Sequence, residues 1–289
     1  MDEQPADSSQ TANCDHIPII DLSSIDSPHI EDRRQLAQNI YGACTQVGFF
    51  YVKNHGISEE SISGIHQAAE RFFNLPEDQK MKVYIGNSKV KIPGYSPIGG
   101  ERSTGTDDEP ISVEEATGVL SEAFDVGYEL AMDFQKSKDD VLPPDIYRLY
   151  GDNQWPDQET LAGFSQTYIQ YCGTLLEFCR RLMKIFALSL DVPEEYFDSK
   201  IRNPGVTSRM MHYPAQPATE TREGLGAHTD FECFTILSQG SVPGLQVLSH
   251  SVSVLENHTS VNDPPCIAPF KAGEWVREKL AKAYVGYEG

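Results

Sequence analysis

Apolar side chains recur at helical spacing in several stretches of the first two hundred residues of this chain. One such pattern covers residues 28–46 and ends at Gly48, and a second covers about 58–73. Pro76, followed by two acidic residues, is good N-terminal chemistry for a further helix. The clearest pattern runs over about 157–190, where apolar residues step by three and four along one face, and we interpret this stripe as core packing. Its members are Leu161, Phe164, Tyr168, Tyr171, Leu175, Cys179, Leu182, Phe186 and Leu190.

Short runs rich in β-branched and aromatic residues predict strands before and after the longest helix. Two of them are IPIIDLSSI at 17–25 and GFFYVKNHGI at 48–57. Beyond residue 200 the pattern changes to short strands, and we expect four: VTSRMMHYP, GLGAHTD, CFTILSQ and GLQVLSH. The acidic stretch 99–122 has no clean period and is expected to form a loop, which is our candidate lid. Residues 1–15 are expected to be a disordered tail.

Composition narrows the classes of function. With 289 residues and 39% hydrophobic content, the chain can bury a large core. Its formal charge of −20 disfavours nucleic acids and anionic membranes as partners. The N-terminus has no apolar signal segment, no apolar run is long enough to span a membrane, and the cysteines show no C-x-x-C spacing. We therefore expect a cytoplasmic protein with reduced thiols. No G-x-G-x-x-G or P-loop string supports nucleotide binding.

His228 and Asp230, in GLGAHTD, carry the candidate chemistry. Alternate residues of a strand point to the same face, so this imidazole and this carboxylate can converge on one metal ion. Two histidines and one carboxylate on one side of a metal leave open positions on the other side, an arrangement suited to non-haem Fe(II) and O2. We therefore expect His228 and Asp230 to be two of three iron ligands.

Several segments occur together in an order that is specific, although none of them is decisive alone. They are IPIIDLSSI, GFFYVKNHGI, RFFNLPEDQKMKV, GYSPIGGER, EAFDVGYE, NQWP, LSLDVPEEYF, MMHYP and GLGAHTDFECFTILSQGSVPGLQV. Over roughly residues 16–248 the chain thus resembles the iron- and 2-oxoglutarate-dependent dioxygenases of the isopenicillin N synthase-like group. The resemblance implies an α+β fold with a double-stranded β-helix (jelly roll) core and an N-terminal helical region. It also implies Fe(II), O2, 2-oxoglutarate as co-substrate, and a small organic substrate.

The resemblance also assigns roles to single residues. His228 and Asp230 match the first two iron ligands, and Tyr213, just before Pro214, matches the phenol that reaches 2-oxoglutarate. Many plant members have Asn at the position of Met211, so a second polar contact to the co-substrate is missing here. By strand alternation the side chain of His212, which lies between Met211 and Tyr213, points away from Tyr213. Three further polar residues are expected to be structural: Arg209, His212 and His55.

The C-terminal segment departs from the family pattern. Members carry a distal His and an Arg-x-Ser far beyond the aspartate, whereas this chain has EKLAKAYVGYEG there. His250 and His258 are the weak alternatives for the third ligand. GEWV at 273–276 resembles the family again, so the residues between Val247 and this motif look inserted. Apolar residues over 275–284 have the spacing of a short amphipathic helix. An incorrect gene model and a natural truncated paralogue both account for this departure.

We therefore divide the chain into a tail (1–15), an N-terminal dioxygenase region (16–200), a partial Fe(II)/2-oxoglutarate core (201–249) and an atypical C-terminal segment (250–289). The predicted function is hydroxylation, desaturation or ring closure of a small organic molecule, in specialised metabolism by family analogy, with activity impaired by the missing distal His. Two alternatives stay open. One is a non-catalytic remnant that binds a small molecule or a protein partner, and the other is a 2-oxoglutarate-independent oxidase of the same family.

Overall fold

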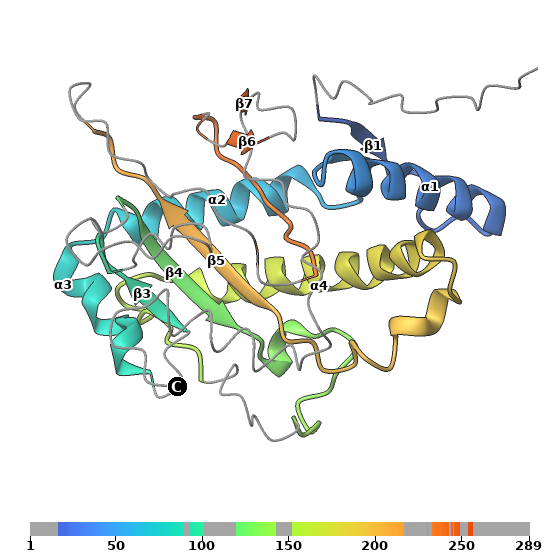
Figure 1. The fold of residues 1–289 in the computed structure, drawn as a ribbon. Coiled ribbons are helices and arrows are strands. Elements are labelled where there is room, and N and C mark those ends of the chain that lie inside the picture. Colours follow the sequence, from blue (N-terminus) through green and yellow to red (C-terminus); the bar gives the residue numbers. More distant parts are fainter. Residues whose placement is uncertain are drawn as a thin grey trace, which may run out of the picture.

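The computed structural model describes residues 17–88, 93–100, 120–142, 152–216, 230, 233–242, 244, 246–248 and 254–256. They form a set of long helices and a three-stranded antiparallel sheet that lies against two of those helices (Figure 1).

Three long helices form where the apolar periodicity predicted them. They are α1 (Ile30–Gln46), α2 (Glu59–Phe73) and α4 (Phe164–Ser189), and a short α3 (Glu77–Lys80) follows Pro76. Both α1 and α2 pack against α4, which is the central helix of the described part (Figure 1). None of the described helices is long and apolar enough to cross a membrane. Four short 3-10 helices complete this part: η1 (Met81–Val83), η2 (Ile85–Asn87), η3 (Leu130–Met132) and η4 (Glu194–Phe197).

The longest helix starts later than predicted and ends at Ser189, close to the predicted end near residue 190. It begins at Phe164 rather than near residue 157, because Gly163, which precedes it, has a left-handed backbone with φ of 76°. The predicted apolar stripe is buried or half-buried with one exception. Leu190 is 58% exposed, because it lies just after the last helical residue and its side chain leaves the packed face.

The main sheet has the order β3-β4-β5, and both neighbouring pairs are antiparallel. Its strands are β3 (Gly94–Ser96), β4 (Glu122–Gly127) and β5 (Thr207–His212), the last of which was predicted from VTSRMMHYP. Two smaller pairs lie elsewhere: β1 (Ile19–Asp21) runs parallel to β2 (Tyr51–Lys53), and β6 (Gln246–Leu248) runs antiparallel to β7 (Val254–Glu256).

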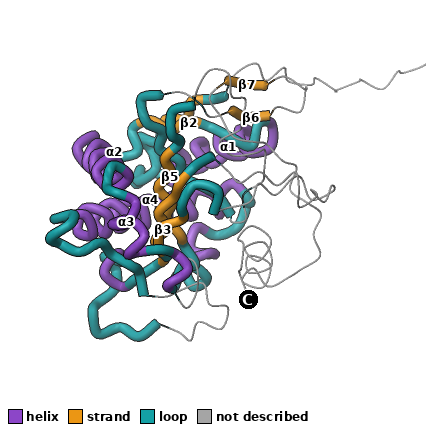
Figure 2. The backbone as a smooth tube through the Cα atoms, turned by 90° about the vertical axis from the view of Figure 1, so that its left-hand side faces the viewer, coloured by secondary structure: helices purple, strands orange, loops and turns teal. Residues whose placement is uncertain are grey.

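The two faces of the main sheet have different neighbours. Phe124 of β4 is fully buried, with its ring centroid 4.7 Å from that of Phe72 in α2 and 5.5 Å from that of Phe164 in α4. Figures 1 and 2 both place these two helices on one side of the sheet. We call this side the helix-covered face. By strand alternation Asp125 and its cross-strand partner Arg209 lie on the opposite face.

One predicted strand is not formed. Residues 233–240, CFTILSQG, form no strand in the described part, so the strand prediction for CFTILSQ is wrong. Its apolar side chains are used in another way: Phe234 packs on Phe186 of α4 at 5.2 Å between ring centroids, and Ile236 joins the same cluster. Phe234 and Ile236 are thus partly buried as the apolar alternation suggests, but they contact a helical cluster instead of completing a sheet.

Several expectations concern residues outside the described part. They are the disordered tail, most of the candidate lid (101–119), the GLGAHTD strand with His228, the weak ligands His250 and His258, and the short helix over 275–284. The division of the chain into an N-terminal region, a core and an atypical C-terminal segment also stays a prediction.

The start of α2 offers a direct stability test. The Ser58 hydroxyl accepts a hydrogen bond from the Ser61 amide at 3.1 Å and satisfies one of the unpaired donors of the first turn. Ser58→Ala is expected to lower the free energy of unfolding by about 1 kcal/mol in urea denaturation. Ser63→Ala is the control, since the Ser63 hydroxyl donates to the Glu60 carbonyl inside the helix, and its loss should change little.

Candidate active site

The end of β5 presents the predicted co-substrate residue. Tyr213 is the first residue beyond the strand, is 48% exposed, and donates from its hydroxyl to the Met211 sulfur at 3.5 Å. Met211 is the cross-strand partner of Ala123, and Ala123 is in turn the partner of Ser96. These three residues lie on the face of the sheet opposite the helix-covered face. Alternation along β5 thus directs Met211 away from α2 and α4.

His212 points to the helix-covered face, as alternation predicted. Its Nδ1 is 2.8 Å from a carboxylate oxygen of Glu122, and its ring lies over Phe73 of α2 with 5.5 Å between centroids. This histidine, whose side chain is 45% exposed, therefore contacts both the sheet and α2 at the edge of their interface. His55 has a structural contact as well, since its Nδ1 accepts the Ile57 amide at 3.1 Å in the turn before α2.

Arg209 holds two strands together on the opposite face. Its Nε and Nη2 donate to the two carboxylate oxygens of Asp125 at 2.7 and 3.0 Å, and Asp125 is only 4% exposed. Such bidentate pairing is the strongest geometry available to a guanidinium and a carboxylate. The expectation that Arg209 is a structural residue rather than an anion clamp agrees with this contact.

Asp230 is the iron-ligand candidate that the structure describes. Its carboxylate is exposed, and the Thr235 hydroxyl donates to one of its oxygens. A hydroxyl that orients a carboxylate in this way is typical of the outer shell of metal sites, so the local chemistry fits a metal ligand. Its partner His228 lies outside the described residues. Within the described part, no group of three His, Cys, Asp or Glu side chains is placed to hold a metal ion.

A buried ionic network lies under the end of β5, and sequence reasoning did not find it. Glu122 accepts from Lys80 Nζ at 2.5 Å and from the Tyr95 hydroxyl at 2.6 Å, and all three side chains are almost fully buried. Burial by itself raises the pKa of Glu122, but the hydrogen bonds from Lys80, Tyr95 and His212 outweigh it and hold that pKa below its ordinary value. Two acidic residues, Glu122 and Asp125, within a short strand that also carries Ala, Phe and Val were the available signal.

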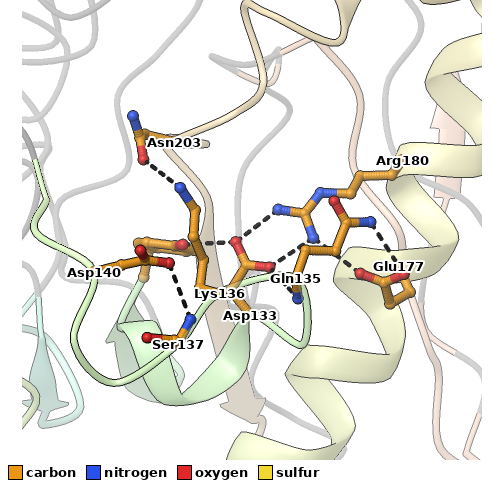
Figure 3. Close-up of polar contacts among 9 residues, drawn as sticks. Asp133, Gln135, Lys136, Ser137, Asp140, Glu177, Arg180 and Asn203 are labelled. Atoms are coloured by element: carbon orange, nitrogen blue, oxygen red, sulfur yellow. Dashed lines mark hydrogen bonds and ion pairs between the residues drawn. The ribbon is translucent and has the colours of Figure 1, made fainter.

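A second buried network ties the segment after β4 to α4 (Figure 3). Arg180 donates to both carboxylate oxygens of Asp133, at 2.7 and 2.6 Å, and Tyr128 donates to one of them at 2.7 Å. The Asp133 side chain is fully buried. Burial by itself raises the pKa of Asp133, but the bonds from Arg180, Tyr128 and the Gln135 amide hold it below the ordinary value. The sequence gives no signal for this pair, because its partners are far apart in the chain.

The NQWP segment also has a structural role. Asn153 pairs with both backbone groups of Gly127, at 2.8 and 2.9 Å, and thereby closes the end of β4. Gln154 donates to the carbonyls of Tyr84 and Pro93 at 3.1 and 2.8 Å. Gly94 lies beside this contact, and a Cβ atom there would be 2.7 Å from the Val83 carbonyl, so only glycine fits.

Two family models match this chain. The non-haem dioxygenase in morphine synthesis N-terminal model matches residues 17–158, and the 2OG-Fe(II) oxygenase superfamily model matches residues 204–271. The second match contains Tyr213, His228 and Asp230. The chain belongs to the 2OG-Fe(II) oxygenase superfamily. Fe(II) and 2-oxoglutarate are the cofactor and co-substrate of this superfamily, and its members include Fe(II)/2-oxoglutarate-dependent dioxygenases.

Curated relatives agree with this membership. The 2-oxoglutarate-Fe(II) type oxidoreductase ppzC of Metarhizium majus is 33% identical over 244 residues, which cover 81% of this chain and 63% of that protein. The 2-oxoglutarate-Fe(II) type oxidoreductase hxnY of Emericella nidulans is 33% identical over 236 residues, which cover 80% and 63%. This chain thus spans somewhat less than two thirds of the length of these 2OG-Fe(II) oxidoreductases.

Solved structures support the same fold. A full-length Neurospora crassa protein in complex with alpha-KG has a TM-score of 0.66 and 23% identity, over 84% of this chain and 69% of that one. A 2OG-Fe(II) oxygenase family protein from Caulobacter crescentus has a TM-score of 0.63 and 23% identity, over 86% and 71%. The helices and antiparallel sheet of this chain therefore follow the fold of these two structures.

Proposed function

We propose that this chain binds Fe(II) and 2-oxoglutarate and oxidises a small organic molecule with O2. The observation that carries the proposal is the superfamily match over residues 204–271, which contains the whole set Tyr213, His228 and Asp230. The local structure supports it at two points. Tyr213 leaves the sheet at the end of β5, and Asp230 is oriented by the Thr235 hydroxyl.

We propose that the sheet β3-β4-β5 is part of a double-stranded β-helix. Its three strands are antiparallel, and one face is covered by α2 and α4 (Figures 1 and 2). The opposite face, with Met211, Arg209 and Asp125, would then line the interior of the jelly roll. That placement explains why the Arg209 and Asp125 charges are neutralised by each other, because an unpaired charge inside the barrel would be costly.

Each site residue has a distinct proposed role. His228 and Asp230 would hold Fe(II), and Thr235 would keep the Asp230 carboxylate in its binding orientation. Tyr213 would donate to 2-oxoglutarate, and Met211 supplies only a weak sulfur acceptor where an asparagine could add a hydrogen bond. When bound, the iron supplies the oxidation chemistry with O2 and 2-oxoglutarate. His250 and His258, the weak candidates for the third ligand, lie outside the described residues. If neither of them binds the iron, a water would take that position.

An anaerobic titration tests this function on the full 289-residue chain. Fe(II) is added first and 2-oxoglutarate second, and the visible absorption spectrum is recorded. We expect a charge-transfer band that needs both additions, because it arises only when 2-oxoglutarate chelates the bound iron. Fe(II) binding without this band would favour the 2-oxoglutarate-independent oxidase. Absence of both Fe(II) binding and the band would overturn the proposal in favour of the non-catalytic remnant.

A further inference from the structure

We propose that His212 is a positioning residue that fixes the end of β5 and thereby aims the Tyr213 phenol at 2-oxoglutarate. The inference rests on the proposed function and goes beyond it, because His212 itself faces away from the site. His212 is anchored on Glu122 and Phe73, Glu122 is itself held in place, and the position of Tyr213 depends on both.

The imidazole of His212 is held on two sides. Its Nδ1 lies 2.8 Å from Glu122 Oε1, and its ring lies over the Phe73 ring of α2 at 5.5 Å and 30° between planes. His212 and Glu122 are also direct cross-strand partners, so backbone and side chain make contact at the same rung of the ladder. An ionised carboxylate only accepts hydrogen bonds, so Nδ1–H is the donor in this contact.

Glu122 cannot follow a moving histidine, because its other oxygen is already bound. Lys80 Nζ and the Tyr95 hydroxyl both donate to Glu122 Oε2, at 2.5 and 2.6 Å. The side chains of Lys80 and Glu122 are 8% and 5% exposed, so water cannot easily replace these contacts. Lys80 comes from α3 and Tyr95 from β3, so the carboxylate is clamped from two elements besides its own strand.

Tyr213 depends on this anchor because the ladder ends beside it. His212 is the last residue of β5 that pairs with β4. Pro214 follows Tyr213 and has no N–H with which to continue a ladder. The last paired backbone unit, that of His212, therefore determines the direction in which the chain leaves the sheet at Tyr213, whose hydroxyl also contacts the Met211 sulfur. Adjacent strand residues point to opposite faces of a sheet. Because the His212 side chain is held against α2, the Tyr213 side chain is directed to the face opposite the helix-covered face.

The test uses His212→Leu, which keeps apolar bulk over Phe73 and removes the Nδ1–H donor. In anaerobic titrations of the Fe(II)-loaded chain we expect 2-oxoglutarate affinity to fall about tenfold, with Fe(II) affinity unchanged. His212→Asn should restore most of the loss, since its side-chain amide places an N–H donor at nearly the same distance from Cα as Nδ1. In a Tyr213→Phe background His212→Leu should have no further effect, because both changes act through the same phenol.

Hydrogen exchange of the metal-free protein gives a readout that needs neither iron nor 2-oxoglutarate. We expect amide exchange at 211–213 to rise about tenfold in His212→Leu and to return in His212→Asn. Tyr168→Phe is the matched control: it removes hydrogen bonds from α4 to Ser208, at the other end of the same strand, at 3.2 and 3.1 Å. It should leave exchange at 211–213 and 2-oxoglutarate affinity unchanged.

The outcomes separate this inference from the proposed function. Wild-type protein that fails to bind 2-oxoglutarate, but whose exchange responds to His212→Leu, would remove the proposed function while supporting the anchoring of β5 by His212. Normal 2-oxoglutarate binding in wild type with no change of affinity or exchange in His212→Leu would overturn the positioning role. The positioning role would also be overturned if His212→Leu lowered the 2-oxoglutarate affinity equally in the wild-type and Tyr213→Phe backgrounds.

Discussion

Arg180→Met is expected to lower the free energy of unfolding by about 3 to 5 kcal/mol, measured by urea denaturation near neutral pH. The guanidinium of Arg180 donates to both oxygens of Asp133, whose side chain is fully buried (Figure 3). Methionine fills similar space but leaves the carboxylate without a charge partner. The Tyr128 hydroxyl, which also donates to Asp133, cannot neutralise that charge. The cost is therefore that of an uncompensated buried ion rather than that of one lost hydrogen bond.

Arg34→Met is the matched control for this prediction. Arg34 pairs with Glu31 one helical turn away at 2.9 Å, but their side chains are 58% and 77% exposed. Exposed pairs contribute little because water screens them, so we expect a change within about 0.5 kcal/mol. Equal losses in the two arginine variants would contradict the assignment of the Asp133 and Arg180 pair as a buried structural ion pair.

The same pair predicts how the stability difference depends on pH. The folded-state pKa of Asp133 lies below its ordinary value, so its stabilisation is fully present above about pH 4 and is lost as pH falls through the folded pKa. In Arg180→Met the buried carboxyl can take up a proton and become neutral at a higher pH. The difference in unfolding free energy between wild type and variant should thus be largest near neutral pH and shrink below about pH 4. A constant difference down to acid pH would argue against an ionic origin.

Asp230→Ala is expected to lower Fe(II) affinity by at least about 100-fold, measured by anaerobic equilibrium dialysis of the full chain. A carboxylate is the hard, charged member of a site built from two imidazoles and one carboxylate, and alanine leaves an uncharged gap in its place. Thr235→Val should have a smaller effect, about tenfold, because it removes only the hydroxyl that orients Asp230. Asp198→Ala, at an exposed carboxylate just after η4, should change nothing.

The graded order of these three variants is the informative result. Unchanged Fe(II) binding in Asp230→Ala would mean that Asp230 is not a ligand, whatever the superfamily membership implies. Equal effects of Asp230→Ala and Thr235→Val, accompanied by loss of folded structure in circular dichroism, would instead show that the segment around 230–235 is merely structural.

Local patterns were sufficient for the helices. Apolar periodicity predicted α1, α2 and α4 because each helix buries one continuous apolar stripe against its neighbours. In α1 the buried residues at helical spacing are Leu36, Ile40 and Ala43, and in α4 they include Phe164, Tyr168 and Tyr171. The ends were less certain. A single left-handed glycine, Gly163, moved the start of α4, and spacing alone does not reveal backbone conformation.

Strands were harder to predict, because alternation reports burial and not the partner. Residues 207–212 pair with β4 as expected of a strand, whereas in 233–240 Phe234 packs partly buried against α4 without joining the sheet. Both segments have the sequence pattern of a strand. Their fates differ because a strand needs a second chain segment with free backbone groups beside it, and that depends on the rest of the fold.

The sequence by itself determined the helical layer, the strand at 207–212 and, through its resemblance to a known family, the candidate residues Tyr213, His228 and Asp230. Only the tertiary structure decided what holds the end of that strand in place. Glu122 meets Lys80, Tyr95 and His212, and Asp133 meets Arg180, across long stretches of chain. Periodicity in the sequence indicates which side chains become buried. It does not indicate the partner of a buried charge, which depends on the tertiary structure, because a charge removed from water requires a nearby opposite charge or hydrogen-bond donor.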